Sequence, residues 1–101
     1  MLAGIAMELL VTLPNVPAGS LSTVADELRQ YGAHVVFETR CTGYVESIAG
    51  RVNFIHDGQS TLMIFLVLDR GHFPRALLIG GIRQTVSEAV ELHLRKTAAH
   101  A

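Results

Sequence analysis

The chain has little of several residue types, and each scarcity excludes a class of protein. It holds one cysteine, Cys41, so it forms no internal disulfide and suits a reducing compartment. Only 17% of its 101 residues are charged, its single lysine is Lys96, and its net charge is -1. Nucleic-acid binding relies on clustered Lys and Arg that neutralise phosphates. We therefore expect a cytoplasmic protein with no nucleic-acid partner.

The chain also lacks an apolar run long enough to cross a membrane. The N-terminal "MLAGIAMELLVTL" is apolar over about 13 residues, whereas a membrane helix needs roughly 20. It has no basic start, and Glu8 interrupts it. We expect no membrane partner. Met7 is an alternative start to Met1, which would leave residues 1–6 as a loose or interface-forming extension of a single domain.

Apolar residues, in contrast, are abundant. Half of the residues are hydrophobic and the mean hydropathy is +0.37. A domain of this size leaves much of its surface exposed, and this chain has too few polar residues to cover the surface of a monomer. We predict a homo-oligomer, a dimer or larger, with an apolar interface.

The first half of the chain contains a short apolar segment and one amphipathic helix. Residues 8–13 end before Pro14 and predict a strand. Apolar residues recur at three- and four-residue steps from Leu21 to Tyr31, which predicts a helix. Ser20 or Ser22 can cap its start and Gly32 can close its end in a left-handed conformation.

Several extended segments follow. Residues 33–41, "AHVVFETRC", alternate between two faces and predict a strand, with Cys41 as a small core residue. Turn signals at Thr42-Gly43 and Ala49-Gly50 flank "YVESI", and "RVNFI" alternates again. Asp57-Gly58 is the strongest hairpin signal. After it, "STLMIFLVL" is apolar without alternation, which predicts a central strand covered on both faces.

From Pro74 onward the pattern becomes helical. Apolar residues repeat at three- and four-residue steps to Leu94, and residues 97–101 are interpreted as a tail. Gly80-Gly81 disfavour a helix interior. Either the helix begins after this pair, or the pair permits close packing against a strand or a partner chain.

The element order is thus β-α-β-β-(β)-β-α. This predicts an α+β, ferredoxin-like sandwich, with an antiparallel sheet and two helices on one face. The uncovered face of the sheet is then the natural dimer surface.

One segment carries a family resemblance. In "LPNVPAGSLSTVADELRQYGAHVV" a strand ends at Asn15-Val16-Pro17, Gly19 opens a helix, and Gly32-Ala33 lead into an apolar strand. This segment resembles the first half of the ACT-type ligand-sensing domain. In that family the loop before the first helix lies at a subunit interface, and its backbone amides hold small ligands. The resemblance implies contact positions at Asn15, Ala18, Gly19, Ser20 and Leu21.

A second candidate binding site lies in "DRGHFPR". Arg70, His72 and Arg75 precede or open the second helix, where free backbone amides and the helix dipole favour an anion. A carboxylate or phosphate would fit there. The alternative is an ordinary strand-to-helix turn with solvated arginines.

Catalytic and metal signatures are weak. The five histidines form no i, i+4 pair and no HExxH motif, and there is no C-x-x-C, so we expect no metal and no cofactor. His34, Glu38 and His56 are the candidates for acid or base chemistry.

We therefore hypothesise a homo-oligomeric sensor or regulatory module that binds a small, anionic molecule at a subunit interface. The alternatives are a small dimeric α+β enzyme that uses His and Glu chemistry, and a structural subunit whose apolar sheet docks another protein.

Overall fold

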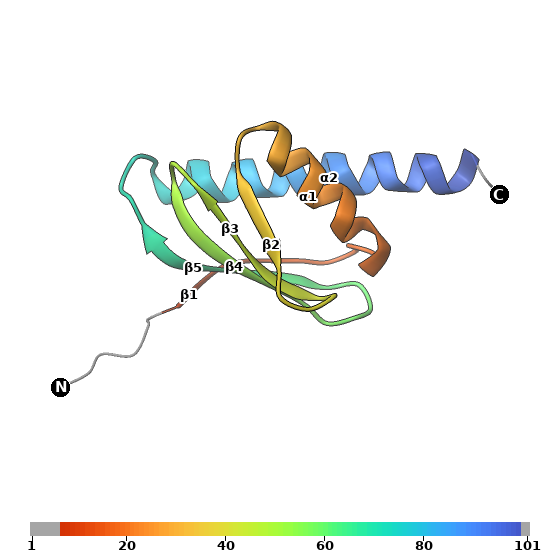
Figure 1. The fold of residues 1–101 in the computed structure, drawn as a ribbon, viewed down its shortest axis with the longest axis horizontal. Helices are drawn as coiled ribbons and strands as arrows, with labels where there is room; N and C mark the ends of the chain where they lie inside the picture. Colours follow the sequence, from red (N-terminus) through yellow and green to blue (C-terminus); the bar gives the residue numbers. More distant parts are fainter. Residues whose placement is uncertain (1–6, 100–101) are drawn as a thin grey trace.

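The computed structural model describes residues 7–99, which form one antiparallel sheet and two α-helices on the same side of it (Figure 1). The elements, in chain order, are β1 (Glu8–Leu13), a 3-10 turn η1 (Ala18–Ser20), α1 (Leu21–Gln30), β2 (His34–Phe37), β3 (Thr42–Ser47), β4 (Gly50–His56), β5 (Leu62–Asp69) and α2 (Arg75–Ala99). The possible extension at residues 1–6 lies outside the described residues, as do residues 100–101 of the interpreted tail. Residues 97–99 belong to α2, so they are not part of a tail.

The strand order is β1-β5-β4-β3-β2, and every neighbouring pair is antiparallel. Strands β2 to β5 follow one another as a meander, and β5 returns beside β1. Strands β1 and β2 form the two edges and run parallel to each other, with α1 connecting them. The α+β class and the antiparallel sheet with two helices on one face are confirmed.

The core lies between the sheet and the helices. Inward-facing residues of alternate strand positions are buried, such as Val11, Phe54 and Ile64. From the helices, Val24 and Ala25 of α1 meet Val86 and Ala89 of α2 in the same cluster. Alternate strand residues point the other way, so each strand has one covered and one uncovered face.

Helix α1 occupies the range that its apolar stripe predicts, but its start is not capped as expected. Ser20 stands at the N-cap position in a helical conformation, and its hydroxyl donates a hydrogen bond to the Pro17 carbonyl 2.6 Å away. Neither Ser20 nor Ser22 caps the helix by a side-chain hydrogen bond. Gly32 closes the helix at a φ of 87°, as predicted.

Strand β2 is shorter than the sequence predicts, because the chain turns after Phe37. The hydroxyl of Thr39 accepts hydrogen bonds from the backbone N–H groups of Cys41 and Thr42, which closes a turn there. Cys41 therefore lies half-exposed in a turn and is not a core residue. The turn predicted at Thr42-Gly43 is wrong, since both residues belong to β3.

The predicted hairpin at Asp57-Gly58 is confirmed between β4 and β5, with Gly58 at a φ of 87°. The Asp57 carboxylate accepts hydrogen bonds from the backbone N–H groups of Gln59, Ser60 and Thr61 at 2.8–3.1 Å. The bond from Gln59, followed by that from Thr61, holds the pKa of the Asp57 carboxyl below its ordinary value of 3.8.

We expect Asp57→Asn to lower the urea midpoint of unfolding at neutral pH. Because the pKa of Asp57 is lower in the folded chain, its stabilising contribution is fully present above 3.8 and is lost as the pH falls through the folded pKa. The difference between wild type and variant should therefore shrink in acid. Asp26→Asn is the matched control, because the Asp26 carboxylate bonds only to Arg29. A gap that is equally wide in acid would contradict this account.

Helix α2 runs without interruption through Gly80 and Gly81. The alternative in which it begins after the pair is wrong. A Cβ atom on either glycine would meet nothing within 4 Å, so no described strand packs closely against them. The pair leaves open space beside the helix.

Candidate functional site

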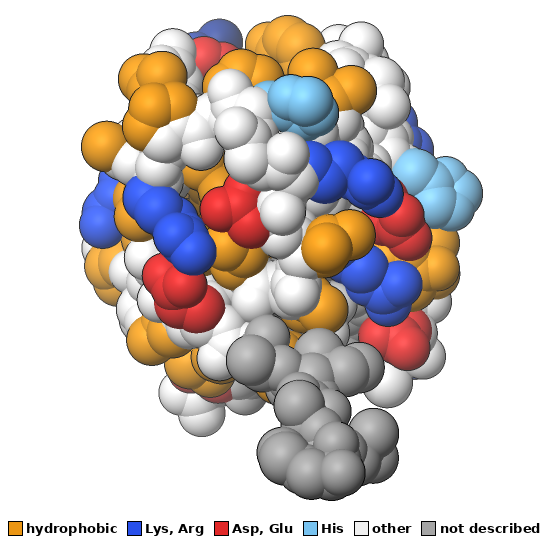
Figure 2. Space-filling view, turned by 90° about the vertical axis from the view of Figure 1, so that its left-hand side faces the viewer, with side chains coloured by type: hydrophobic (Ala, Val, Ile, Leu, Met, Phe, Trp, Pro, Cys, Tyr) orange, Lys and Arg blue, Asp and Glu red, His pale blue; other side chains and the backbone are white. Residues whose placement is uncertain are grey.

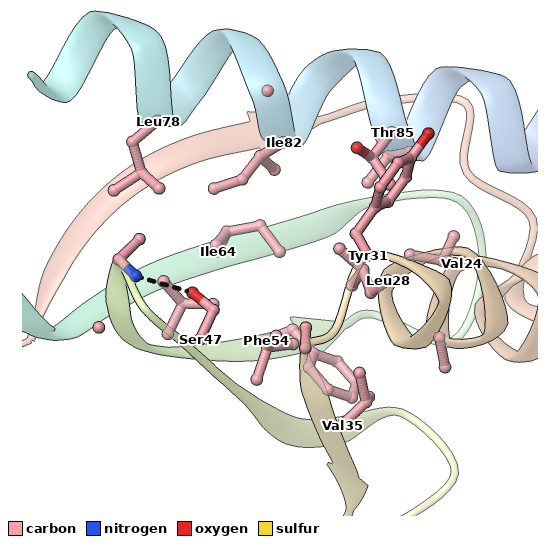
Figure 3. Close-up of a pocket in the computed structure, with 18 of the residues that line it drawn as sticks. Val24, Leu28, Tyr31, Val35, Ser47, Phe54, Ile64, Leu78, Ile82 and Thr85 are labelled. Carbon is pink, nitrogen blue, oxygen red and sulfur yellow. Dashed lines mark hydrogen bonds between the residues drawn. The ribbon is translucent and has the colours of Figure 1, made fainter. Parts of the chain in front are cut away.

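A cavity of about 340 Å³ lies between the inner face of the sheet and the two helices (Figure 3). We call it the sheet–helix cavity. Its deepest walls are buried strand residues, including Phe54, Leu62 and Ile64, which are 2–6% exposed. Its lining consists of Leu21, Val24, Ala25, Leu28, Tyr31, Ala33, Val35, Phe37, Val45, Ser47, Ala49, Gly50, Val52, Phe54, Leu62, Ile64, Leu66, Phe73, Leu77, Leu78, Gly81, Ile82, Thr85 and Val86.

The cavity exists because the first half of α2 is not packed tightly on the sheet. Val86 and Ala89 are buried at 5% and 0% exposure, whereas no residue from Arg75 to Thr85 is buried. Helix α1 lies against the later part of α2, so it does not fill the space under the earlier part (Figure 1). Small residues widen this space further, since Ala33, Ala49 and Gly81 each present little side-chain volume to it.

The lining carries no charged side chain. Its polar side chains are the hydroxyls of Tyr31, Ser47 and Thr85. Tyr31 extends from the end of α1 toward Thr85 of α2, and Ser47 accepts a hydrogen bond from the backbone N–H of Ala49 at 3.1 Å (Figure 3). A charged group placed inside would lose its hydration without gaining a counter-ion, which is costly. The cavity therefore suits an uncharged, mainly apolar molecule.

Exposed apolar side chains surround the opening of the cavity. Tyr31, Phe37, Phe73 and Leu77 line it and yet are 37–72% exposed. They come from three different parts of the chain: the end of α1, strand β2, and the loop before α2 together with the first turn of that helix. Solvent reaches the cavity past these side chains.

The five positions implied by the ACT resemblance lie together around η1, but they do not form an open pocket. Asn15 has a positive φ of 60° and is exposed, as are Ala18 and Gly19. A Cβ on Gly19 would lie 3.4 Å from the His93 ring of α2. Ser20 is fully buried, and Leu21 belongs to the core and the cavity lining. Of these five residues, Leu21 is the one that reaches the cavity.

The segment "DRGHFPR" lies at the opposite end of the sheet from η1 (Figure 1). Arg70 and His72 line a shallow open depression together with Glu46. Arg75 is already paired with Glu8 at 2.8 Å and lies 3.9 Å from Asp69. Figure 2 faces this end and shows basic side chains beside acidic ones, without a continuous basic patch. The structure therefore does not bring the candidate binding residues around η1 together with those of "DRGHFPR".

His56 has a structural place in the core. It is 4% exposed, and its Nδ1 accepts a hydrogen bond from the backbone N–H of Gly58 at 2.9 Å. This acceptor role puts the proton on Nε2, which donates to the Val16 carbonyl at 2.6 Å. Both ring nitrogens are thus occupied, and the ring fastens the segment before η1 to strand β4.

His34, Glu38 and His56 do not share one site. His34 is exposed and pairs with Glu46 across β2 and β3, while Glu38 is exposed just beyond β2. His34 stands at the opposite end of the strands from His56. None of the three residues lines the sheet–helix cavity. The structure does not bring the acid-base candidates together.

Within residues 7–99, no cluster of three His, Cys, Asp or Glu side chains is arranged to hold a metal ion. Neither α1 nor α2 combines the length and the apolar composition of a membrane-spanning segment.

Sequence reasoning missed the cavity. Of the residues that line it, Leu21 alone was among the sequence-based candidates, because apolar residues at helix and strand spacing look like ordinary core residues. The small lining residues Ala33, Ala49 and Gly81 were the one sequence feature that could have indicated open space.

No protein-family model, no curated protein and no solved structure matches the chain.

Proposed function

We propose that the chain is a small-molecule-binding module with a sensing or regulatory role, and that its ligand is uncharged and mainly apolar. The observation that carries this proposal is the sheet–helix cavity, with about 340 Å³ of space and no charged residue in its lining. Small-molecule sites in proteins are concave, mainly apolar and hold a few polar groups, with volumes from roughly 300 Å³ upward. The hydroxyls of Tyr31, Ser47 and Thr85 are the groups that would orient the ligand.

An anion held at a subunit interface is the weaker version of this proposal. Its support is the depression beside Arg70 and His72, which also contains the opposing carboxylate of Glu46. The enzyme alternative has less support still, because its candidate residues lie apart and the ring nitrogens of His56 are both engaged.

The ACT resemblance supports a sensing role through the β1-α1-β2 unit, which lies at Glu8–Leu13, Leu21–Gln30 and His34–Phe37. A ferredoxin-like description of the sandwich belongs to the same proposal, supported by antiparallel pairing and helices on one face. A cytoplasmic location, favoured by the single cysteine, completes it.

We expect an uncharged fluorescent probe, N-phenyl-1-naphthylamine, to bind saturably, with octanol and octanoate as competitors of equal chain length. At neutral pH octanol should displace the probe at a concentration at least about tenfold lower than octanoate, because burying a carboxylate without a counter-ion is costly. Fluorescence titration measures both displacements. A stronger effect of octanoate would favour the anion site instead, and no saturable probe binding would refute the cavity proposal.

Two glycine variants place the probe. Gly81 lines the cavity and Gly80 does not, yet both lie in α2 with open space around them. Replacing either by Leu improves helix propensity by about 1 kcal/mol. Gly81→Leu should occupy part of the cavity and weaken probe binding, while Gly80→Leu should leave probe binding unchanged. Equal binding by the two variants would show that the probe lies elsewhere.

A further inference from the structure

The face of the sheet that points away from the helices, here the outer face, carries a row of paired residues across all five strands. Val36, Tyr44, Asn53, Phe65 and Leu9 are neighbours in register, from β2 through β3, β4 and β5 to β1. Residues directly opposite in an antiparallel pair share a face. Four members of this row are apolar or aromatic, and the uncharged Asn53 is in the middle.

No described element covers this face, since both helices lie on the other side (Figure 1). The first seven residues of β5, "LMIFLVL", are nevertheless all apolar, which is the pattern of a strand covered on both faces. Its outward residues Met63 and Phe65 are only partly buried, as is Ile55 beside them on β4. The composition of the sheet therefore calls for a second layer that residues 7–99 do not supply.

The centre of the outer face holds unsatisfied polar atoms. Asn53 Oδ1 has almost no contact with solvent and no hydrogen-bond partner among the described residues. Its Nδ2 donates only to Met7 Sδ, 3.7 Å away, and sulfur is a weak acceptor. Arg51 Nε is in the same state on the same strand, although its guanidinium carbon lies 3.7 Å from the centre of the Tyr44 ring. Because the chain's own atoms screen both of these atoms from solvent, a partner layer reaches them only if a neighbouring side chain such as that of Met7 moves aside.

We propose that a second copy of this chain covers the outer face, with the two-fold axis near Asn53. In an isologous interface a residue at the axis meets its own copy. Once the Met7 side chain moves aside, a carboxamide suits that position, because it carries a donor and an acceptor and so can pair with another carboxamide. A charged side chain there would repel itself. The Glu46 and Arg51 pair, 3.5 Å apart, places both charge signs beside this centre, which is again self-complementary.

The face is large enough for a stable contact. Five strands about 4.8 Å apart and about six residues long at roughly 3.3 Å each span an area on the order of 500 Å². Two copies would bury roughly 1000 Å², which is about the minimum for a specific interface. The outer face is opposite to the sheet–helix cavity, so this proposal holds or fails independently of the proposed ligand.

Light scattering coupled to size exclusion, together with sedimentation equilibrium, tests the proposal on the full chain. The wild type should have twice the 10.9 kDa mass of the chain at micromolar concentration. Asn53→Asp keeps the side-chain shape and sets two carboxylates against each other, so the dimer dissociation constant should rise at least about tenfold. Phe65→Glu should give a monomer. Leu94→Glu and Gln30→Glu are the matched controls, because they make equivalent changes at exposed helix positions. Both variants should remain dimers.

Circular dichroism checks that each variant is folded. If Phe65→Glu does not fold, Asn53→Asp still decides the test, because it hardly changes the shape of the side chain. A monomeric wild type at all concentrations overturns the proposal, including the case in which this face binds a different protein. A wild-type dimer that neither outer-face variant weakens overturns it too, because the copies would then meet through another surface.

Discussion

Gly43→Ala is expected to lower the free energy of unfolding by about 3 kcal/mol. A Cβ at this position would lie 2.1 Å from the carbonyl oxygen of Val36 and 2.6 Å from the ring of Phe54. The Val36 oxygen belongs to the backbone of neighbouring β2, so no side-chain rotation relieves that clash. Phe54 is held edge-on against Phe37, with ring centres 5.3 Å apart, so it cannot move freely either.

Urea unfolding followed by circular dichroism measures this effect, with Gly80→Ala as the control. At Gly80 the added methyl group meets nothing within 4 Å, and the helix gains about 1 kcal/mol. The two Gly→Ala changes should thus move stability in opposite directions. A Gly43→Ala variant as stable as the wild type would mean that β2 and β3 are not paired as described.

His56→Leu is the second change with a large expected effect, a loss of about 1 to 3 kcal/mol in the free energy of unfolding. Leucine keeps most of the apolar volume but removes both hydrogen bonds of the imidazole ring. The buried Val16 carbonyl would remain without a partner, and a buried unsatisfied group costs about 1–3 kcal/mol. The Gly58 N–H lies in an exposed turn, so water can replace its lost bond.

The matched control is His72→Leu, because His72 is exposed in the loop before α2. It should change the urea midpoint little. If both variants lost the same stability, the loss would come from removing a histidine in general and not from the bonds of His56. An unaltered His56→Leu variant would contradict the buried hydrogen-bonded geometry.

Local patterns account for most of the fold. Strand β1, helix α1 with its closing Gly32, the hairpin at Asp57-Gly58 and strand β5 occur where periodicity and turn residues predict them. These signals depend on neighbours in the chain. Gly43 shows where they fail: with Thr42 it looks like a turn, yet it lies inside β3, because Phe54 of the next strand occupies the space where a side chain would be. That reason is visible only once the strands are paired.

The candidate site was much less predictable. Whether an apolar residue such as Leu66 or Ile82 packs against other side chains or faces an open cavity depends on the spacing between sheet and helix, which no local pattern encodes. His56 shows the same limit for a polar residue. Its type suggested acid-base chemistry, but its partners are two backbone groups, one of them 40 residues away in the chain, that only the folded state brings to it.

The two halves of α2 also differ in how firmly they are held. Around Val86 and Ala89 the helix is anchored in the core, whereas the turns from Arg75 to Gly81 contain two glycines, each costing about 1 kcal/mol of helix stability. Their start is fastened by the exposed pair between Arg75 and Glu8. Local unfolding draws on the least stable segments of a protein. The sheet–helix cavity is therefore bounded on one side by a weakly held part of α2, and we expect partial melting of that segment to open the cavity while the sheet stays intact.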